Sequence, residues 1–424
     1  MAMEVVNCLL RDIPLPRMVE VRQIFDTKHL ENPAGALRTE LERDEVRQTL
    51  HQGMSIAVTA GSRGIDHCAA MLRELISFLK EQGTCPFIIP AMGSHGGACE
   101  EGQIEILTHY GITEEAMGCP IRATMEVQKI GVLEDGRPIY IDKYAAQADG
   151  IIAINRIKAH TAFRGDYESG VMKMLTIGLG KQVGAEVCHR DGIPLLGMNV
   201  EKFAFGILAH ANVLLGIGIV ENAFDRTYAV RVMTAAQIPK EEPELLRLSK
   251  SLMSYIKLKH TDVLVVDRIG KNISGEGMDP NVTGRWIVPS ITGGIDATRL
   301  AVLGLTPESS GNFQGLGMAD VCSRNVMQEL DFDKSYANSL TSTVPSLCKI
   351  PMWCESQKLA IQAAVQMTPG RTPEQITMVR IADTLSLETV FVSENLQPLL
   401  ENRSDIEIIG TPQAWHFDAQ GNLF

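Results

Sequence analysis

The chain has 424 residues, of which 45% are hydrophobic and 21% charged, the composition of an ordinary folded protein. Its formal net charge of −12, without any basic block, argues against a nucleic-acid partner. The nine cysteines are scattered and form no CxxC pair, which favours a reducing compartment over a disulfide framework or a zinc ribbon.

Neither a secretory signal nor a membrane span is expected. The N-terminus lacks a charged segment followed by an apolar one, and no apolar run reaches the roughly 20 residues that a transmembrane helix needs. We therefore expect a cytoplasmic protein without membrane contact.

Strands and helices alternate along the first half of the chain, with glycine-containing turns between them. A short strand is expected near 3–10 and an exposed helix over 39–52. The elements that follow are strand 55–60, helix 66–82, strand 86–91, helix 98–110, two short strands within 121–143, strand 150–154, helix 197–211, strand 212–222 and helix 240–256. This alternation is typical of a parallel α/β sheet.

A strong strand at 261–270 begins a second region. Its further expected elements are strand 300–306, helix 355–366 and strands 376–381, 388–393 and 405–409. Because 424 residues exceed one simple core, we predict two α/β domains with mostly parallel or mixed sheets and an inter-domain cleft. The predicted N-terminal domain spans 1–258 and carries the site. The C-terminal domain spans 259–401, and the tail 402–424 packs back on the body.

Reactive side chains gather in the segment 150–191. A buried strand leads there into a basic loop with Lys158 and His160. An apolar stretch with Lys173 and Lys181 follows, and the segment closes on His189. Loops at strand ends present polar groups that a buried strand cannot, so this segment predicts a site.

Two glycine-containing turns follow the first two strands. In GSRG (61–64), free backbone N–H groups with Ser62 and Arg63 suit a phosphate or carboxylate, although a tight turn with a surface arginine fits as well. In MGSHGG (92–97), the flanking glycines leave His95 open to a ligand, whereas a scaffold histidine is the alternative.

Lys173 admits two interpretations from its neighbours alone. Its neighbours Val171, Met172 and Met174 fit a position on a helix from which the amine of Lys173 extends to solvent. The same apolar surroundings favour the neutral amine that a nucleophile or attachment point requires.

Taken together, these motifs resemble the nickel-dependent lactate racemase family over about residues 55–190. In that family a TRP-type motif follows the first strand and a G-[ST]-H motif follows the second. A histidine, a lysine and a further histidine sixteen residues beyond the lysine come next. The matching positions here are Ser62-Arg63, Gly93-Ser94-His95, His160, Lys173 and His189, with 189 − 173 = 16.

The resemblance implies an isomerase, a racemase or epimerase of a 2-hydroxy acid. Its cofactor would be the nickel-pincer nucleotide (pyridinium-3,5-bisthiocarboxylic acid mononucleotide with nickel), attached at Lys173, with His189 as a nickel ligand. His95 and His160 would be the acid/base pair, and Ser62 and Arg63 would bind the cofactor or an anionic group. Hydride would pass from the substrate to the cofactor and back. The implied partners are a small anionic hydroxy acid and the proteins that synthesise the cofactor and insert nickel.

Some positions depart from the family pattern. Ala60 replaces an aspartate, Gly64 replaces a proline, and the interval from His160 to Lys173 is about three residues longer than in the lactate enzymes. The longer loop favours a substrate larger than lactate, such as a sugar acid. Lys158 and Lys181 are alternative anchors, while Lys271 and Arg285 are candidates for substrate contacts in the second domain.

Two other functions fit the same residues. One is a zinc- or iron-dependent hydrolase or lyase that uses His95, His160 and His189, although Lys173 would then have no role. The other is a non-catalytic protein that binds anionic sugars or nucleotides, which the missing aspartate at Ala60 keeps open.

Overall fold

The computed structural model describes residues 3–424, and the chain divides into two compact units. The inserted unit is the continuous stretch Asp26–Met253. The flanking unit joins the residues up to Phe25 with Ser254–Phe424, so the chain starts and ends in the same unit.

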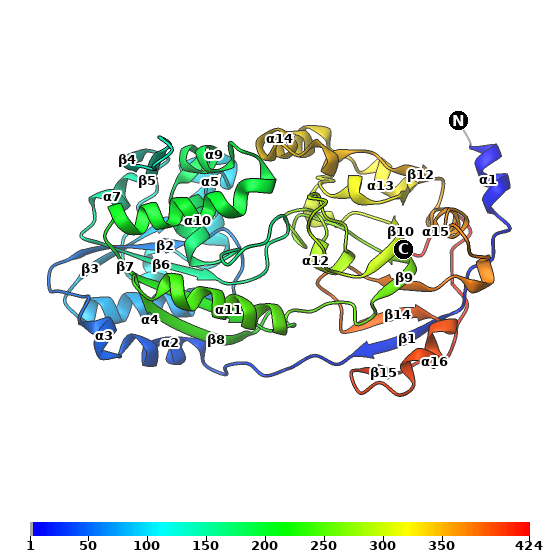
Figure 1. The fold of residues 1–424 in the computed structure, drawn as a ribbon, viewed down its shortest axis with the longest axis horizontal. Helices are drawn as coiled ribbons and strands as arrows, with labels where there is room; N and C mark the ends of the chain where they lie inside the picture. The colour runs from blue at the N-terminus through cyan, green and yellow to red at the C-terminus, as the bar shows by residue number, and fades with distance from the viewer. Residues whose placement is uncertain (1–2) are drawn as a thin grey trace. The chain divides into compact units, whose positions relative to one another are not determined.

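The stretch up to Phe25 belongs to the flanking unit, whereas the predicted domain division places it in the N-terminal domain. Strand β1 (Met18–Gln23) pairs antiparallel with β14 (Thr389–Ser393) on one side and with β15 (Ile406–Ile408) on the other (Figure 1). Val19 and Val21 are buried in the core of the flanking unit, which explains why this strand belongs there.

The flanking unit contains one sheet, in the order β12-β11-β10-β9-β13-β14-β1-β15. Neighbouring strands are parallel from β12 to β13 and antiparallel from β13 to β15. Its other strands are β9 (His260–Val266), β10 (Asp296–Val302), β11 (Val321–Ser323), β12 (Met352–Cys354) and β13 (Met378–Ile381). Its helices are α1 (Glu4–Leu10), α12 (Pro280–Thr283), α13 (Arg324–Gln328), α14 (Phe332–Ser342), α15 (Gln357–Gln366) and α16 (Gln397–Leu400).

Both chain ends of this unit pack on its body. The strand expected near 3–10 is the helix α1, whose backbone groups bond within the helix instead of to a neighbouring strand. In the tail, Trp415 Nε1 donates to the carbonyl oxygen of Pro16 at 2.9 Å. Leu423 N donates to Gln357 at 2.6 Å.

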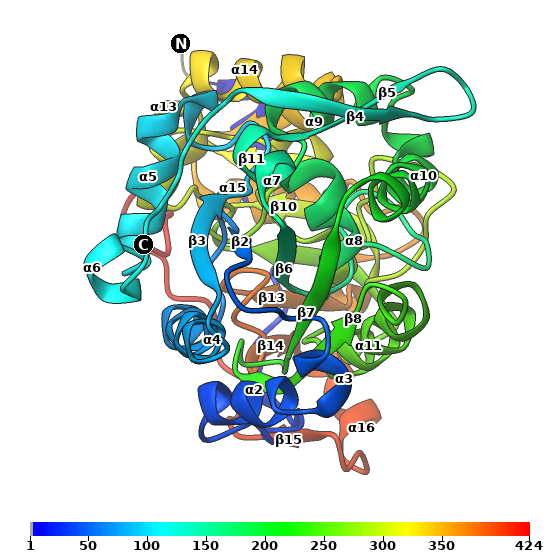
Figure 2. The same ribbon diagram turned by 90° about the vertical axis from the view of Figure 1, so that its left-hand side faces the viewer.

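The inserted unit contains a five-stranded sheet in the order β3-β2-β6-β7-β8, with helices on both faces (Figure 2). Its strands are β2 (Ser55–Ala60), β3 (Cys85–Pro90), β6 (Gly150–Arg156), β7 (Val213–Glu221) and β8 (Thr227–Thr234), and β4 (Val127–Val132) and β5 (Pro138–Asp142) form a separate antiparallel pair. Its helices are α2 (Pro33–Leu41), α3 (Asp44–Arg47), α4 (Cys68–Glu81), α5 (Glu100–His109), α6 (Glu114–Met117), α7 (Lys143–Gln147), α8 (Val171–Lys173), α9 (Lys181–His189), α10 (Ile193–His210) and α11 (Ile238–Leu252).

The predicted α/β class is confirmed, with parallel strands in the main sheet of each unit. Strand β8 was not predicted. Among residues 3–424, no helix combines the length and the apolar composition that a bilayer span requires.

Strands β3, β2, β6 and β7 run parallel, so their carboxyl ends lie at one edge of the sheet. The chain passes from β2 to β3 on one side, whereas β6 adjoins β2 on the other side. The loops after β2 and β6 therefore diverge at a topological switch point, where open α/β sheets bind their ligands.

Strand β7 has different side chains on its two faces. Leu215, Ile217 and Ile219 belong to the core beneath α2 and α4. Gly216 faces the other way, where a Cβ atom would lie 2.8 Å from Ile238 and 2.9 Å from Val171. This glycine therefore lets α8 and α11 approach the sheet closely, which positions the segment that carries Lys173.

Replacing Val21 by alanine is expected to lower the free energy of unfolding of the flanking unit by about 2 kcal/mol, because buried methyl groups are lost from β1. The three tryptophans, Trp286, Trp353 and Trp415, all lie in this unit, so urea unfolding followed by tryptophan fluorescence reports on it. Arg22→Ala on the same strand is the control, with an expected change within about 0.5 kcal/mol. An unchanged midpoint for Val21→Ala would contradict this placement of β1.

Candidate active site

The predicted site residues lie on segments that follow the parallel strands of the inserted unit. The loop after β2 carries Ser62 and Arg63, the loop after β3 carries His95, and the segment after β6 carries His160, Lys173 and His189. The last segment consists of a loop, α8, the π-helix Met174–Gly178 and α9. Parallel strand order thus brings three separate loops to one edge of the sheet.

His95 contacts Ser62 across the two neighbouring loops. The Ser62 hydroxyl is hydrogen-bonded to Nδ1 of His95, so proton transfer to a ligand falls to Nε2. Gln103 holds the backbone of this loop, because its Nε2 donates to the carbonyl oxygens of Gly93 at 3.1 Å and His95 at 3.2 Å. Arg63 is exposed in the preceding loop, and its electrostatic neighbours are Tyr110 and Arg156.

His160 has contacts at both ring nitrogens. Its Nε2 lies 2.7 Å from Nζ of Lys173, and its Nδ1 accepts the backbone N–H of Ala162 at 3.0 Å. The ring stacks on Phe163, with 4.1 Å between centroids. Burial, together with the surrounding cations, holds the pKa of His160 well below its usual value of 6.5, so the imidazole is neutral near pH 7.

A buried carboxylate organises the loop around His160. Glu168 is fully buried and accepts the backbone N–H of His160 at 2.7 Å. Its other oxygen accepts from Lys250 Nζ at 2.7 Å, and Arg164 lies 3.3 Å away. The sequence did not single out Glu168, because nothing local distinguishes it from the exposed Asp166.

Lys173 ends α8 and immediately precedes the π-helix Met174–Gly178. Helices of this type are rare and often occur at functional sites. The start of α8 is held by Glu242 from α11, which accepts the backbone N–H of Met172 at 3.0 Å. Burial raises the pKa of the Glu242 carboxyl to about 8.

His189 at the end of α9 is arranged as a metal ligand would be. Its Nδ1 lies 2.7 Å from the carbonyl oxygen of Ala185, which can only accept, so Nδ1 carries the proton. The lone pair is then on Nε2. Burial lowers the pKa of His189, which favours the neutral imidazole that metals bind.

The other two candidate lysines differ from Lys173 in their contacts. Lys181 is fully buried, with Nζ 3.0 Å from Asp142 and 3.3 Å from Gln103, so it serves the packing of α9. Lys158 is partly buried, and its positive charge lowers the pKa of His160. Lys173, in contrast, hydrogen-bonds the imidazole of His160.

The hydrolase alternative would need a cluster of metal ligands. Within residues 3–424, no three histidine, cysteine or carboxylate side chains gather closely enough to hold a metal ion. His95, His160 and His189 thus do not form a ready three-ligand set.

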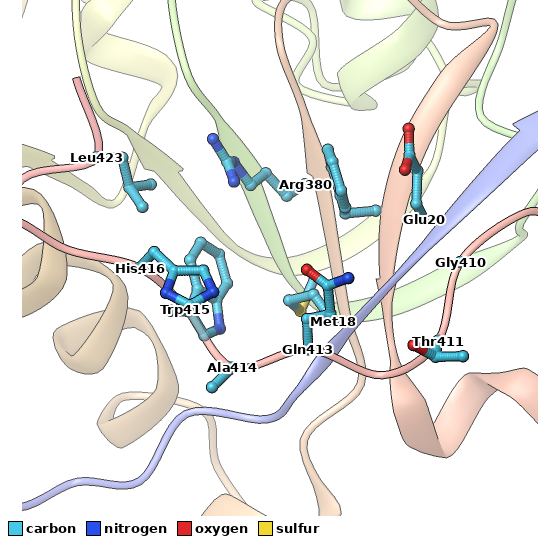
Figure 3. A pocket seen from close by; sticks show the side chains of 11 residues that line it. Met18, Glu20, Arg380, Gly410, Thr411, Gln413, Ala414, Trp415, His416 and Leu423 are labelled. Atoms are coloured by element: carbon cyan, nitrogen blue, oxygen red, sulfur yellow. The ribbon is translucent and has the colours of Figure 1, made fainter.

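The flanking unit contains a pocket of its own (Figure 3). Arg380, Trp415 and His416 contribute to its lining. Arg380 is already paired with Asp267 through bonds of 2.8 and 2.9 Å, so its charge is neutralised within the protein. None of the predicted site residues lines this pocket.

Comparison with known proteins agrees with the motif order. The family model described as lactate racemase N-terminal domain matches residues 8–193. Residues 8–193 of this chain are therefore similar to the N-terminal domain of lactate racemases. A solved structure of the lactate racemase apoprotein from Thermoanaerobacterium thermosaccharolyticum shares the fold, with a TM-score of 0.52 at 10% identity over 87% of this chain and 99% of that one. No curated protein matches the sequence.

The departures from the lactate racemase pattern have local structural explanations. Ala60 is buried in the core at the end of β2, where an aspartate would be desolvated. The longer loop between His160 and Lys173 is closed by backbone hydrogen bonds between Lys158 and Ser169 and is held from inside by Glu168.

Glu242→Gln is expected to stabilise the inserted unit at about pH 8 by on the order of 3 kcal/mol relative to the wild type, and to change little at about pH 5. Because the folded carboxyl has a pKa of about 8 against 4.5 ordinarily, the folded state keeps a proton that the unfolded chain loses. Stability of the wild type therefore falls as the pH rises through this window.

Urea unfolding followed by far-UV circular dichroism at several pH values measures this difference. Glu244→Gln, on the exposed face of the same helix, is the control and should show no pH-dependent gain. A difference between Glu242→Gln and the wild type that stays constant with pH would contradict the assignment.

Proposed function

We propose that the chain is a racemase or epimerase of a 2-hydroxy acid that uses a lysine-tethered nickel-pincer nucleotide. The observation that carries this proposal is the contact of Lys173 with His160, with His189 close enough to affect the charge of that imidazole. This contact lies in the part of the chain that matches the lactate racemase N-terminal domain.

The residues of the site suit the proposed cofactor. Lys173 offers an amine for the tether, and His189 offers an Nε2 lone pair to nickel, for which imidazole is a good ligand. The Ser62-Arg63 turn suits the anionic phosphate of a nucleotide. When bound, the cofactor would accept a hydride from the substrate carbon and return it to the opposite face.

His95 and His160 would then handle the hydroxyl proton. They follow β3 and β6, which flank β2 on its two sides, so the imidazoles can approach a substrate from different directions. Ser62 would orient His95 with Nε2 toward the substrate. An imidazole can both accept and donate a proton, so the pair suits removal and return of the hydroxyl proton.

We further propose that the substrate is a hydroxylated acid larger than lactate, such as a sugar acid. The longer loop after His160 and the positive charges of Lys158 and Arg164 near that imidazole support an extended anionic substrate. A racemase screen that finds turnover of lactate alone would remove this part of the proposal.

Lys173→Arg is expected to abolish a covalent adduct of nucleotide mass and the stoichiometric nickel that accompanies it. The measurement is intact mass and metal analysis of protein made together with the cofactor-synthesis proteins. Lys158→Arg, which alters a nearby lysine, is the control and should keep the adduct. An adduct that survives in Lys173→Arg would make Lys158 or Lys181 the better anchor.

The same measurement separates the alternatives. Zinc or iron without an adduct would favour the hydrolase or lyase. Protein with neither adduct nor metal, yet with affinity for anionic sugars or nucleotides, would favour the binding function.

Per molecule that carries the adduct, His95→Gln and His160→Gln are each expected to lower kcat for racemisation by about 10²- to 10⁴-fold, because each removes one acid/base group. Ser62→Ala, which leaves His95 in place but removes its hydroxyl partner, should have a smaller effect of about tenfold. The rate of racemisation from each enantiomer measures both. Full activity of either glutamine variant would contradict the assigned roles.

A further inference from the structure

The hydrogen bonds of His160 determine which of its nitrogens carries the proton. The backbone N–H of Ala162 points at Nδ1 at 3.0 Å, and a peptide N–H can only donate. Nδ1 must therefore offer a lone pair. A neutral imidazole has one N–H group, which this contact assigns to Nε2.

The proton on Nε2 in turn determines the state of Lys173. Nε2 lies 2.7 Å from Nζ of Lys173, so its N–H needs an acceptor there. An ammonium group has three donors and no acceptor, whereas a neutral amine has a lone pair. We propose that Lys173 is held as a neutral amine that accepts the Nε2 proton of His160.

The charges around the pair support this state. Lys158 and Arg164 lie on the loop of His160, and His189 comes from α9. Two carboxylates lie on that loop: Glu168 is paired with Lys250 and Arg164, and Asp166 is exposed to solvent. A further positive charge on Lys173 would be repelled by Lys158 and Arg164, and burial of the region opposes it as well. Burial is also the largest reason that the pKa of His160 lies well below 6.5.

The neutral state matters for attachment. An ordinary lysine is neutral in only about one molecule in a thousand near pH 7.5, whereas an amine that attacks an electrophilic carbon must be neutral. His160 would thus prepare Lys173 before any cofactor arrives, a role separate from acid/base catalysis. That Lys173 is the tether rests on the proposed function; its protonation state does not.

Attachment would also change His160. In attachment, the neutral amine would form a bond to a thiocarboxyl carbon of the cofactor, and the oxygen of that group would leave as water with protons from the amine and the acid. The resulting acylated nitrogen has no lone pair available as an acceptor, so the Nε2 proton would no longer be held by Lys173. The imidazole would then be able to serve the substrate. Formation of the tether would in this way release a catalytic group that the unmodified lysine occupies.

The test is nuclear magnetic resonance of the full chain prepared without cofactor. In protein with ¹⁵N-labelled histidine, the ring shifts of His160, assigned by their loss in His160→Gln, distinguish the two tautomers. In protein with ¹³Cε-labelled lysine, the shift of Lys173 distinguishes amine from ammonium. We expect the Nε2–H tautomer and a neutral Lys173 at about pH 7.5. The Nδ1–H tautomer with a protonated Lys173 would overturn the inference.

Two substitutions at the lysine sharpen the comparison. Lys173→Met removes the partner of Nε2 but not the Ala162 contact, so the Nε2–H tautomer should persist. Lys173→Arg introduces a permanent donor, which should drive the proton of His160 to Nδ1 or break the contact with Ala162. The exposed Lys240 provides a reference lysine signal in the same spectra.

The result of this test can be told apart from the result of the adduct measurement that tests the proposed function. An adduct on Lys173 in a protein whose His160 is the Nδ1–H tautomer would overturn this inference alone. A neutral Lys173 in a protein that never acquires an adduct would leave the inference in place and remove the proposed function.

Discussion

The candidate site depends on four parallel strands whose carboxyl ends lie at one edge of the inserted unit's sheet. Because β3, β2, β6 and β7 share this direction, the loops that carry His95, Ser62 and His160 must meet there. The strand order reverses at β2, and open α/β sheets bind their ligands at such switch points. Gly216 on β7 then lets α8 approach the sheet, which brings Lys173 to the same edge.

Each functional segment is held by a buried polar side chain from elsewhere in the unit. Gln103 bonds the backbone of His95, Glu168 the backbone N–H of His160, and Glu242 the N–H of Met172, next to Lys173. Buried polar groups cost desolvation energy, so their contribution is to position more than to stabilise. This arrangement fixes the backbone and leaves the functional side chains to contact one another, as His160 does with Lys173 and Ser62 with His95.

Local patterns in the sequence were sufficient for most strands of the inserted unit and for the α/β class. Strand 55–60 was predicted at its observed bounds, because a buried parallel strand is a continuous apolar run. The motif order indicated the lactate racemase family, and the model of that family's N-terminal domain matches residues 8–193. What the sequence could not supply depends on distant partners. The pairing of β1 with β14 joins residues more than 360 positions apart, and β8 has mixed polarity. Glu168, Glu242 and Gln103 are single polar residues whose burial only the tertiary fold determines, so no motif could have identified them.

We propose that this edge of the sheet supports racemisation by hydride transfer, with His95 and His160 handling only the hydroxyl proton. The most direct test follows the hydrogen on the substrate's second carbon. Protein loaded with cofactor would be incubated in ordinary water with a panel of 2-hydroxy acids deuterated at that carbon, and the racemised product analysed by mass spectrometry. If the substrate hydrogen moves to the cofactor and back as a hydride, it does not exchange with water, so we expect the product to retain the deuterium. Racemised product that has lost deuterium to the solvent would contradict it and would point to proton abstraction from carbon.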